Sequence, residues 1–182
     1  IASLELLRDR LPETGADAAR QLVQSLERGA LRLTHLIDNL LESVRIEAGR
    51  VVLRRQAVHV DEVVEEAVEM VRPLADQRGQ TIDVQLPHPL PVVTGDGPRL
   101  VQVFVNLLAN AGKFAPDGTT IRVGGEVLAG QVAIWVEDDG PGWSEEVEPQ
   151  LFEPFVRSTG EEPESSGVGL GLYIAKSIVE RH

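Results

Sequence analysis

The chain has 182 residues, of which 42% are hydrophobic and none is cysteine, and its formal net charge is −12. This length and composition fit one typical domain with an appendage and a real hydrophobic core. They exclude disulfides, thiolate metal sites and a cysteine nucleophile, and the acidic balance argues against a broad nucleic-acid or anionic-membrane surface, which needs clustered Lys and Arg.

The first fifty residues predict a helical hairpin. Ile1 to Arg10 is the end of a helix, Leu11 to Gly15 is a turn, and a long helix runs from Ala16 to about Gly49. In that helix apolar residues recur at alternating steps of four and three: Ala19, Val23, Leu26, Ala30, Leu33, Ile37, Leu40 and Val44. This spacing is typical of a bundle seam. We expect a homodimeric four-helix bundle, and packing onto the rest of the chain is the competing interpretation.

The remaining residues predict a unit of mixed helices and strands. A strand or linker spans Val51 to Val60, and a helix runs from Val60 to about Arg78, which Pro73 bends or ends. The periodicity and turn residues then predict four strands and two helices. The strands are Thr81–Leu86, Val92–Thr94, Thr120–Leu128 and Gln131–Val136, and the helices follow Asp96 as an N-cap and the glycines that end at Gly171.

The helix that contains Gln102 to Phe114 carries the first chemical signal. Its apolar residues face a core, while Asn106, Asn110 and Lys113 follow the spacing i, i+4, i+7 and project together on another face. A carboxamide oxygen suits Mg²⁺ and an ammonium suits a phosphate, so the row is typical of a metal–triphosphate site. The alternative is an ordinary amphipathic helix with a polar outer face.

The second signal follows the last predicted strand. Asp138 stands where the strand ends, and Gly140 and Gly142 form the turn behind it. A carboxylate there can accept a hydrogen bond from an exocyclic amine such as that of adenine, and glycines let a flat ring approach the backbone. The alternative is an ordinary acidic turn.

The third signal is a glycine-rich start to the last helix. It comprises Gly167, Val168, Gly169, Leu170, Gly171 and Leu172. A glycine-rich helix N-terminus offers unpaired N–H groups and a positive dipole end to a phosphate. The pattern is neither a dinucleotide fingerprint nor a P-loop, and its alternative is a helix start selected for close packing. The preceding stretch, Ser158 to Ser166, is expected to be a mobile loop.

Together and in this order, the three motifs resemble the catalytic half of sensor histidine kinases. The resemblance extends to two further features, a phenylalanine motif at Leu151 to Phe155 and a second bundle helix that contains Arg32 to Leu41 and Ile46 to Gly49. It therefore covers essentially the whole chain. It implies an α+β fold, with helices for dimerisation and phosphotransfer at residues 1–50 and a catalytic ATP-binding domain at 51–182. That domain would be the α/β sandwich of gyrase B, Hsp90 and MutL, in which helices cover one face of a mixed sheet.

The resemblance also assigns roles to residues. Asp138 would bind the adenine amine in a pocket shaped by Gly140 and Gly142, and Asn110 would coordinate Mg²⁺ beside Asn106. Lys113 would contact the phosphates. The other ATP-binding residues implied are Phe114, Phe155, Arg157, Gly167, Val168, Gly169, Leu170, Gly171 and Leu172.

The implied activity is that of a protein-histidine kinase. It would transfer the γ-phosphoryl of Mg-ATP to a bundle histidine, and from there to an aspartate of a response regulator. ATP-hydrolysing relatives carry a glutamate one helical turn before the metal-binding asparagine, and the amide of Asn106 cannot take up a proton there. The alternatives are an ATPase of the gyrase and Hsp90 type, and a nucleotide-silent dimerisation module.

Several departures from the family pattern accompany the resemblance. The histidines present, at positions 35, 59, 88 and 182, do not fit the phosphoacceptor, so we expect a fragment whose first helix is truncated. We also expect that the C-terminal strands of the family are missing. Gly112 replaces a bulky apolar residue, and Trp143 replaces a smaller aliphatic one. We expect a cytoplasmic segment without direct membrane contact, compatible with an inner-membrane anchor in the full-length protein.

Overall fold

A computed structural model describes residues 39–46, 52–144, 147–156 and 168–182, together with positions 23, 26, 29, 30, 33, 37 and 48. The chain divides into two compact units, Ile1–Val44 and Arg45–His182. The described residues from position 23 to position 46 are helical, as the seam pattern predicts. The predictions for residues 1–15, for the cap at Gly49 and for the loop at 158–166 lie outside the described residues.

The second unit follows the predicted order of elements. Its strands are β1 (Gln56–Val58), β2 (Thr81–Gln85), β3 (Val93–Gly95), β4 (Thr120–Leu128) and β5 (Gln131–Glu137). Its helices are α3 (Val60–Gln77), α4 (Gly97–Phe114) and α5 (Gly171–Arg181), and a 3₁₀ turn spans Glu148–Gln150. Predicted and observed ends of these strands and helices coincide or differ by one residue, except that Val51–Val60 contains only the three-residue strand β1.

Helix α3 removes one of the two expectations for Pro73, that the residue ends the helix. Pro73 lies inside the helix, which continues to Gln77, so it does not end α3. Proline removes one backbone donor, and an amphipathic helix whose buried face is fixed by tertiary packing tolerates that loss. The buried face extends past the proline, because Val71 and Ala75 are both buried.

Helix α4 begins as predicted. The side chain of Asp96 caps it by accepting a hydrogen bond from Arg99 N at 3.4 Å, and a proline stands in its first turn. Arg54 N also donates to the other oxygen of Asp96, at 2.8 Å, so the same carboxylate holds the incoming chain.

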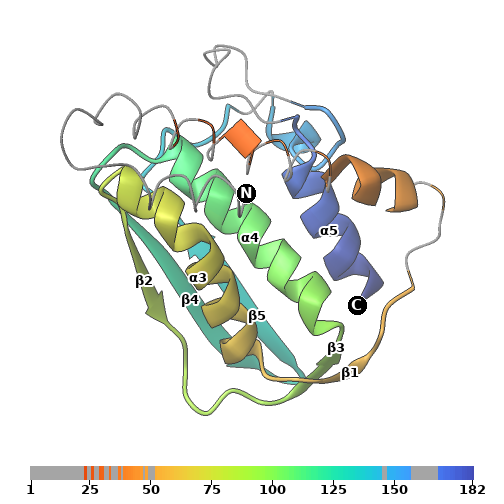
Figure 1. The fold of residues 1–182 in the computed structure, drawn as a ribbon. Coiled ribbons are helices and arrows are strands. Elements are labelled where there is room, and N and C mark those ends of the chain that lie inside the picture. The colour runs from red at the N-terminus through yellow and green to blue at the C-terminus, as the bar shows by residue number, and fades with distance from the viewer. Residues whose placement is uncertain are drawn as a thin grey trace. The chain divides into compact units, whose positions relative to one another are not determined.

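The strands form a mixed sheet and a separate ribbon. In the sheet the order is β2-β4-β5, with β2 parallel to β4 and β4 antiparallel to β5. Strands β1 and β3 pair antiparallel as a two-stranded ribbon. Helices α3 and α4 lie side by side over one face of the sheet, and α5 packs beside α4 (Figure 1). This arrangement confirms the predicted mixed sheet covered by helices.

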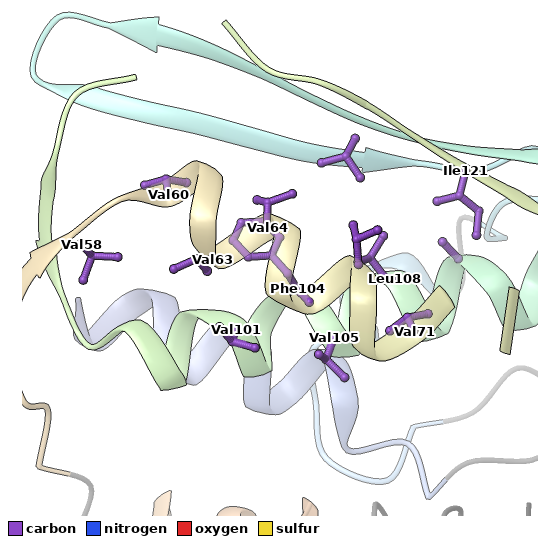
Figure 2. Close-up of a cluster of buried hydrophobic side chains, with 14 residues drawn as sticks. Val58, Val60, Val63, Val64, Val71, Val101, Phe104, Val105, Leu108 and Ile121 are labelled. Atoms are coloured by element: carbon purple, nitrogen blue, oxygen red, sulfur yellow. The ribbon is translucent and has the colours of Figure 1, made fainter. Parts of the chain in front are cut away.

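The main core fills the space between α3, α4 and the sheet (Figure 2). Val64, Leu108 and Ile121 are each at most 1% exposed, so α3, α4 and the sheet are closely packed there. A second cluster joins α4 to α5 through Val103, Ile174 and others, and it includes Ile46 of the incoming chain. Core packing therefore fixes the position of α5 on α4.

The end of α5 is tied to the start of α4. His182 Nε2 accepts a hydrogen bond from Asp96 N at 2.9 Å, and Nδ1 of the same ring lies 2.8 Å from Ile178 O. A ring that accepts at Nε2 and donates from Nδ1 is neutral. His182 thus has a structural role that no local sequence pattern indicates.

Candidate functional site

Three segments of the second unit meet around the C-terminal half of α4. A Cβ placed on Gly140, after β5, would lie 3.1 Å from Phe114 O at the end of α4. A Cβ on Gly171, the first residue of α5, would lie 3.6 Å from Asn106 Oδ1. The structure therefore brings together segments that carry the three motifs, which are separated by tens of residues in the chain.

Asn106 differs from the predicted arrangement. It is only 7% exposed and does not project outward with Asn110 and Lys113, which are half-buried. Its side chain points toward the start of α5, and its Nδ2 has no hydrogen-bond partner among the described residues. A buried amide donor without a partner is unfavourable unless a bound group accepts from it. Its position beside a helix N-terminus suits an anionic oxygen.

The loop after β5 is shaped around Asp138. The Oδ1 atom of Asp138 accepts a hydrogen bond from Gly140 N at 2.8 Å, and a Cβ on Gly140 would stand 2.5 Å from that oxygen. Glycine at 140 is therefore required for this turn. Oδ2 accepts no hydrogen bond from the described residues, so the exposed carboxylate retains an oxygen that can accept one from a ligand amine.

The glycine motif before α5 is held by the phenylalanine motif. Phe155 N donates to Gly169 O at 3.0 Å, and both residues have positive φ, 65° at Phe155 and 75° at Gly169. Phenylalanine rarely adopts this conformation, and such strained residues gather at functional sites. The side chain of Phe155 is 56% exposed, so its burial does not explain the strain.

Two aromatic residues and a cation are in contact at the C-terminal end of α4. Lys113 Nζ lies 4.3 Å from the centre of the Phe114 ring, and Phe114 meets Trp143 edge-on with ring centres 5.4 Å apart. Trp143 is 44% exposed. It therefore belongs to the surface beside the Asp138 loop and not to the core.

The remaining predicted residues divide into three groups. Arg157 and Gly167 lie outside the described residues. Leu170 is 1% exposed and packs in the cluster between α4 and α5, so it supports the glycine loop from inside and does not line the site. Val168 and Leu172 are at least partly accessible next to it.

The residues of the site fit a magnesium nucleotide through oxygen donors. The described part of the chain contains no group of three or more His, Asp or Glu residues that could hold a metal ion. Mg²⁺ is commonly held by one or two protein ligands together with substrate phosphates, and the amide oxygen of Asn110 can supply such a ligand. The partnerless Asn106 amide and the glycine turns fit the phosphates.

Two residues near this site were missed by the sequence analysis. Arg78 and Gln80 follow α3, and their side chains donate to backbone carbonyls at the end of α4. Both partners are more than thirty positions away in the chain, and no local pattern signals such contacts.

Comparison with known proteins identifies relatives of this arrangement. Residues 95–182 match the family described as histidine kinase-, DNA gyrase B- and HSP90-like ATPase. The chain is 34% identical to sensor protein KdpD of Escherichia coli over 178 residues, which cover 98% of this chain and 19% of KdpD. It thus spans about a fifth of the length of this curated relative.

Solved structures agree with the sequence match. The mycobacterial sensor histidine kinase MprB is 30% identical with a TM-score of 0.61, over 70% of this chain and 80% of that one. Full-length ShkA in complex with AMPPNP is 27% identical with a TM-score of 0.72, over 88% of this chain and 33% of that one. Among the described helices, none combines the length and the apolarity that crossing a membrane requires.

Proposed function

Because the chain belongs to the sensor histidine kinase family, we propose that Arg45–His182 binds Mg-ATP and supplies its γ-phosphoryl to a histidine of the dimerisation helices. The single observation that carries the proposal is the buried, partnerless amide of Asn106 beside the glycine start of α5. A triphosphate oxygen would satisfy that amide and also meet the positive end of α5.

The nucleotide would lie between the Asp138 loop and the start of α5. Asp138 Oδ2 would accept from the adenine amine, while Gly140 keeps the turn open. Asn110 would hold Mg²⁺, and Lys113 would contact the phosphate chain as a cation. Gly169 and Gly171 would surround the phosphates, together with Gly167 and Arg157.

Asn106 decides between kinase and hydrolase chemistry in this proposal. Its amide cannot take a proton at neutral pH, so a water molecule near the γ-phosphoryl would not be activated by it. The chain's residues position and stabilise the phosphoryl group, and the acceptor must be a better nucleophile presented by another segment. We infer a histidine of the bundle as that acceptor and an aspartate of a response regulator as the next one.

Exposed apolar residues of the first unit support a homodimer. Leu33, Ile37, Leu40 and Val44 continue one seam, and each is about half exposed, between 48% and 58%. A helical stripe of this kind is stable in water when a second helix pair covers it. A second copy of the chain would form the four-helix bundle. Sedimentation equilibrium would give twice the chain mass if this holds, and the mass of one chain if it does not.

The proposal is tested by calorimetric titration with a non-hydrolysable ATP analogue, with and without Mg²⁺. We expect binding that strengthens with Mg²⁺, and that weakens at least about tenfold in Asp138→Asn, because the amide presents an N–H to the adenine amine. Asp139→Asn is the matched control, since its exposed carboxylate pairs with Arg122 at 3.2 Å.

Three outcomes would contradict the assignment. Equal losses of affinity in Asp138→Asn and Asp139→Asn would mean that Asp138 does not bind the adenine amine. Steady phosphate release without an acceptor would favour the ATPase alternative. Absence of binding by the folded, unchanged chain would favour the nucleotide-silent module.

A further inference from the structure

The C-terminal end of α4 is held by two side chains from the turn that follows α3. Gln80 Nε2 donates to the carbonyls of Ala115 and Pro116 at 3.2 and 3.1 Å, and to Gly112 O at 3.1 Å. Arg78 Nη1 donates to Lys113 O at 2.9 Å and also to Gly112 O. The last carbonyls of a helix lack partners within the helix, so these donors satisfy groups that would otherwise be unpaired. We name Arg78 and Gln80 the carbonyl clamp.

The carbonyl clamp is itself fixed in place. Arg78 O accepts from Gly118 N at 2.9 Å, Arg78 Nε pairs with Asp117 at 2.7 Å, and Thr81 N donates to Thr119 O at 3.0 Å. The turn between α3 and β2 and the turn between α4 and β4 are thereby joined along their length. Figure 1 shows both helices ending at the same edge of the unit.

Gly112 makes room for the clamp. Gln80 is 4% exposed, and its Oε1 lies 3.4 Å from the position that a Cβ at 112 would take, with Ile121 Cδ1 at 3.7 Å. Alanine would therefore just fit at 112, and a bulky apolar residue would collide with Gln80. Glycine in a helix interior weakens that helix. The hydrogen bonds from Gln80 and Arg78 restrain the backbone at the position where glycine loosens it.

The restrained carbonyls belong to the segment that carries two residues of the proposed nucleotide site. The carbonyl of Lys113 accepts a hydrogen bond from Arg78, and the carbonyl of Ala115 accepts one from Gln80. Phe114 lies between these two residues in the chain. A change in the direction of this last turn would move the ammonium of Lys113 relative to the start of α5.

We propose that Arg78 and Gln80 are positioning residues for phosphate binding, and that they act through the last turn of α4 on Lys113. This inference rests on the proposed nucleotide site. It also couples Gly112 and Gln80: the glycine leaves the space that the Gln80 side chain occupies, and Gln80 donates a hydrogen bond to the glycine carbonyl. The clamp touches neither the nucleotide nor the reacting atoms.

The test is a double-mutant cycle on affinity for the non-hydrolysable ATP analogue. Gln80→Met keeps the length of the side chain and removes its N–H donors. We expect it to weaken binding about tenfold in the unchanged chain and less than about twofold in a Lys113→Ala background, because Gln80 affects binding through the position of Lys113. A merely structural role would lower the melting temperature but leave the same affinity loss in both backgrounds.

Two further variants keep the test decisive. Gln77→Met, at an exposed position of α3, is the control and should bind as the unchanged chain does. Arg78→Gln removes the second member of the clamp at a partly exposed site, and it carries the cycle if Gln80→Met does not fold. Equal losses in both backgrounds, or no loss, would overturn the positioning role. Absence of binding by the unchanged chain would instead remove the proposed function, and this inference with it.

Discussion

Substitution of Gly169 by alanine tests the link between the glycine loop and the phenylalanine motif. Gly169 has φ of +75°, and a Cβ there would lie closer to Val156 O than the sum of the two van der Waals radii, and 3.0 Å from Phe155 C and 3.1 Å from Val156 N. All three are backbone atoms, so no side-chain rotation can relieve the contact. The loop must move, and the hydrogen bond from Phe155 N to Gly169 O must lengthen or break.

The two effects add in the folded state. A left-handed conformation costs alanine roughly 1–2 kcal/mol, and overpacking typically costs about 1–3 kcal/mol more. The sum, roughly 2–5 kcal/mol, corresponds to a fall in melting temperature of roughly 4–20 °C for a chain of this size. We expect affinity for the ATP analogue to fall at least about tenfold, because the glycine loop no longer meets the start of α5 at the same angle.

Gly130→Ala is the matched control for this experiment. Gly130 has φ of +80° in the hairpin turn between β4 and β5, and a Cβ there would have no heavy atom within 4 Å. Only the conformational cost applies, so calorimetry should show a fall of roughly 2–8 °C and unchanged nucleotide affinity. If Gly169→Ala melts no lower than Gly130→Ala and binds the analogue equally well, the close packing of the two loops has no functional role.

Two further predictions concern the core and the aromatic surface. Leu108→Ala, at a fully buried position of α4, should lower the free energy of unfolding by about 2–5 kcal/mol in a urea titration. Leu74→Ala, at a side chain that is 47% exposed, should lower the free energy of unfolding far less. Equal decreases in the two variants would mean that Leu108 is not central to the core. Trp143→Leu should abolish the change in tryptophan emission that addition of the ATP analogue causes, while the emission of Trp135, on β5, stays constant. An unchanged signal in the variant would separate Trp143 from the nucleotide.

Local patterns predicted most of the elements correctly, for physical reasons that can be named. Helices α3 and α4 follow from apolar periodicity, and the start of α4 from Asp96, whose carboxylate caps the helix by a contact three residues away. The hairpin of β4 and β5 follows from alternation and from Gly130 at positive φ. In each case the deciding interaction lies within a few residues, where sequence spacing determines geometry.

The predictions failed where distant segments decide the outcome. Pro73 does not end α3, because burial on both sides of it maintains the helix. Asn106 is buried and not projecting, because α5 covers it from a segment more than sixty residues away. The contacts of Gln80 with α4, and of His182 with Asp96, likewise join parts of the chain that no periodicity relates. The sequence predicted the row of Asn106, Asn110 and Lys113 on α4. It did not predict that Asn106 contacts α5.

Helix α5 has a mechanical consequence that follows from how its two ends are held. Near its C-terminus, Arg181 donates to Ile46 O at 3.3 Å and accepts at its own carbonyl from Arg55 at 2.9 Å. Its N-terminus, Gly171, lies against Asn106. Eleven residues of helix form a stiff rod about 16 Å long. The chain where it enters the unit is therefore joined through one continuous helix to a position beside the proposed phosphate site.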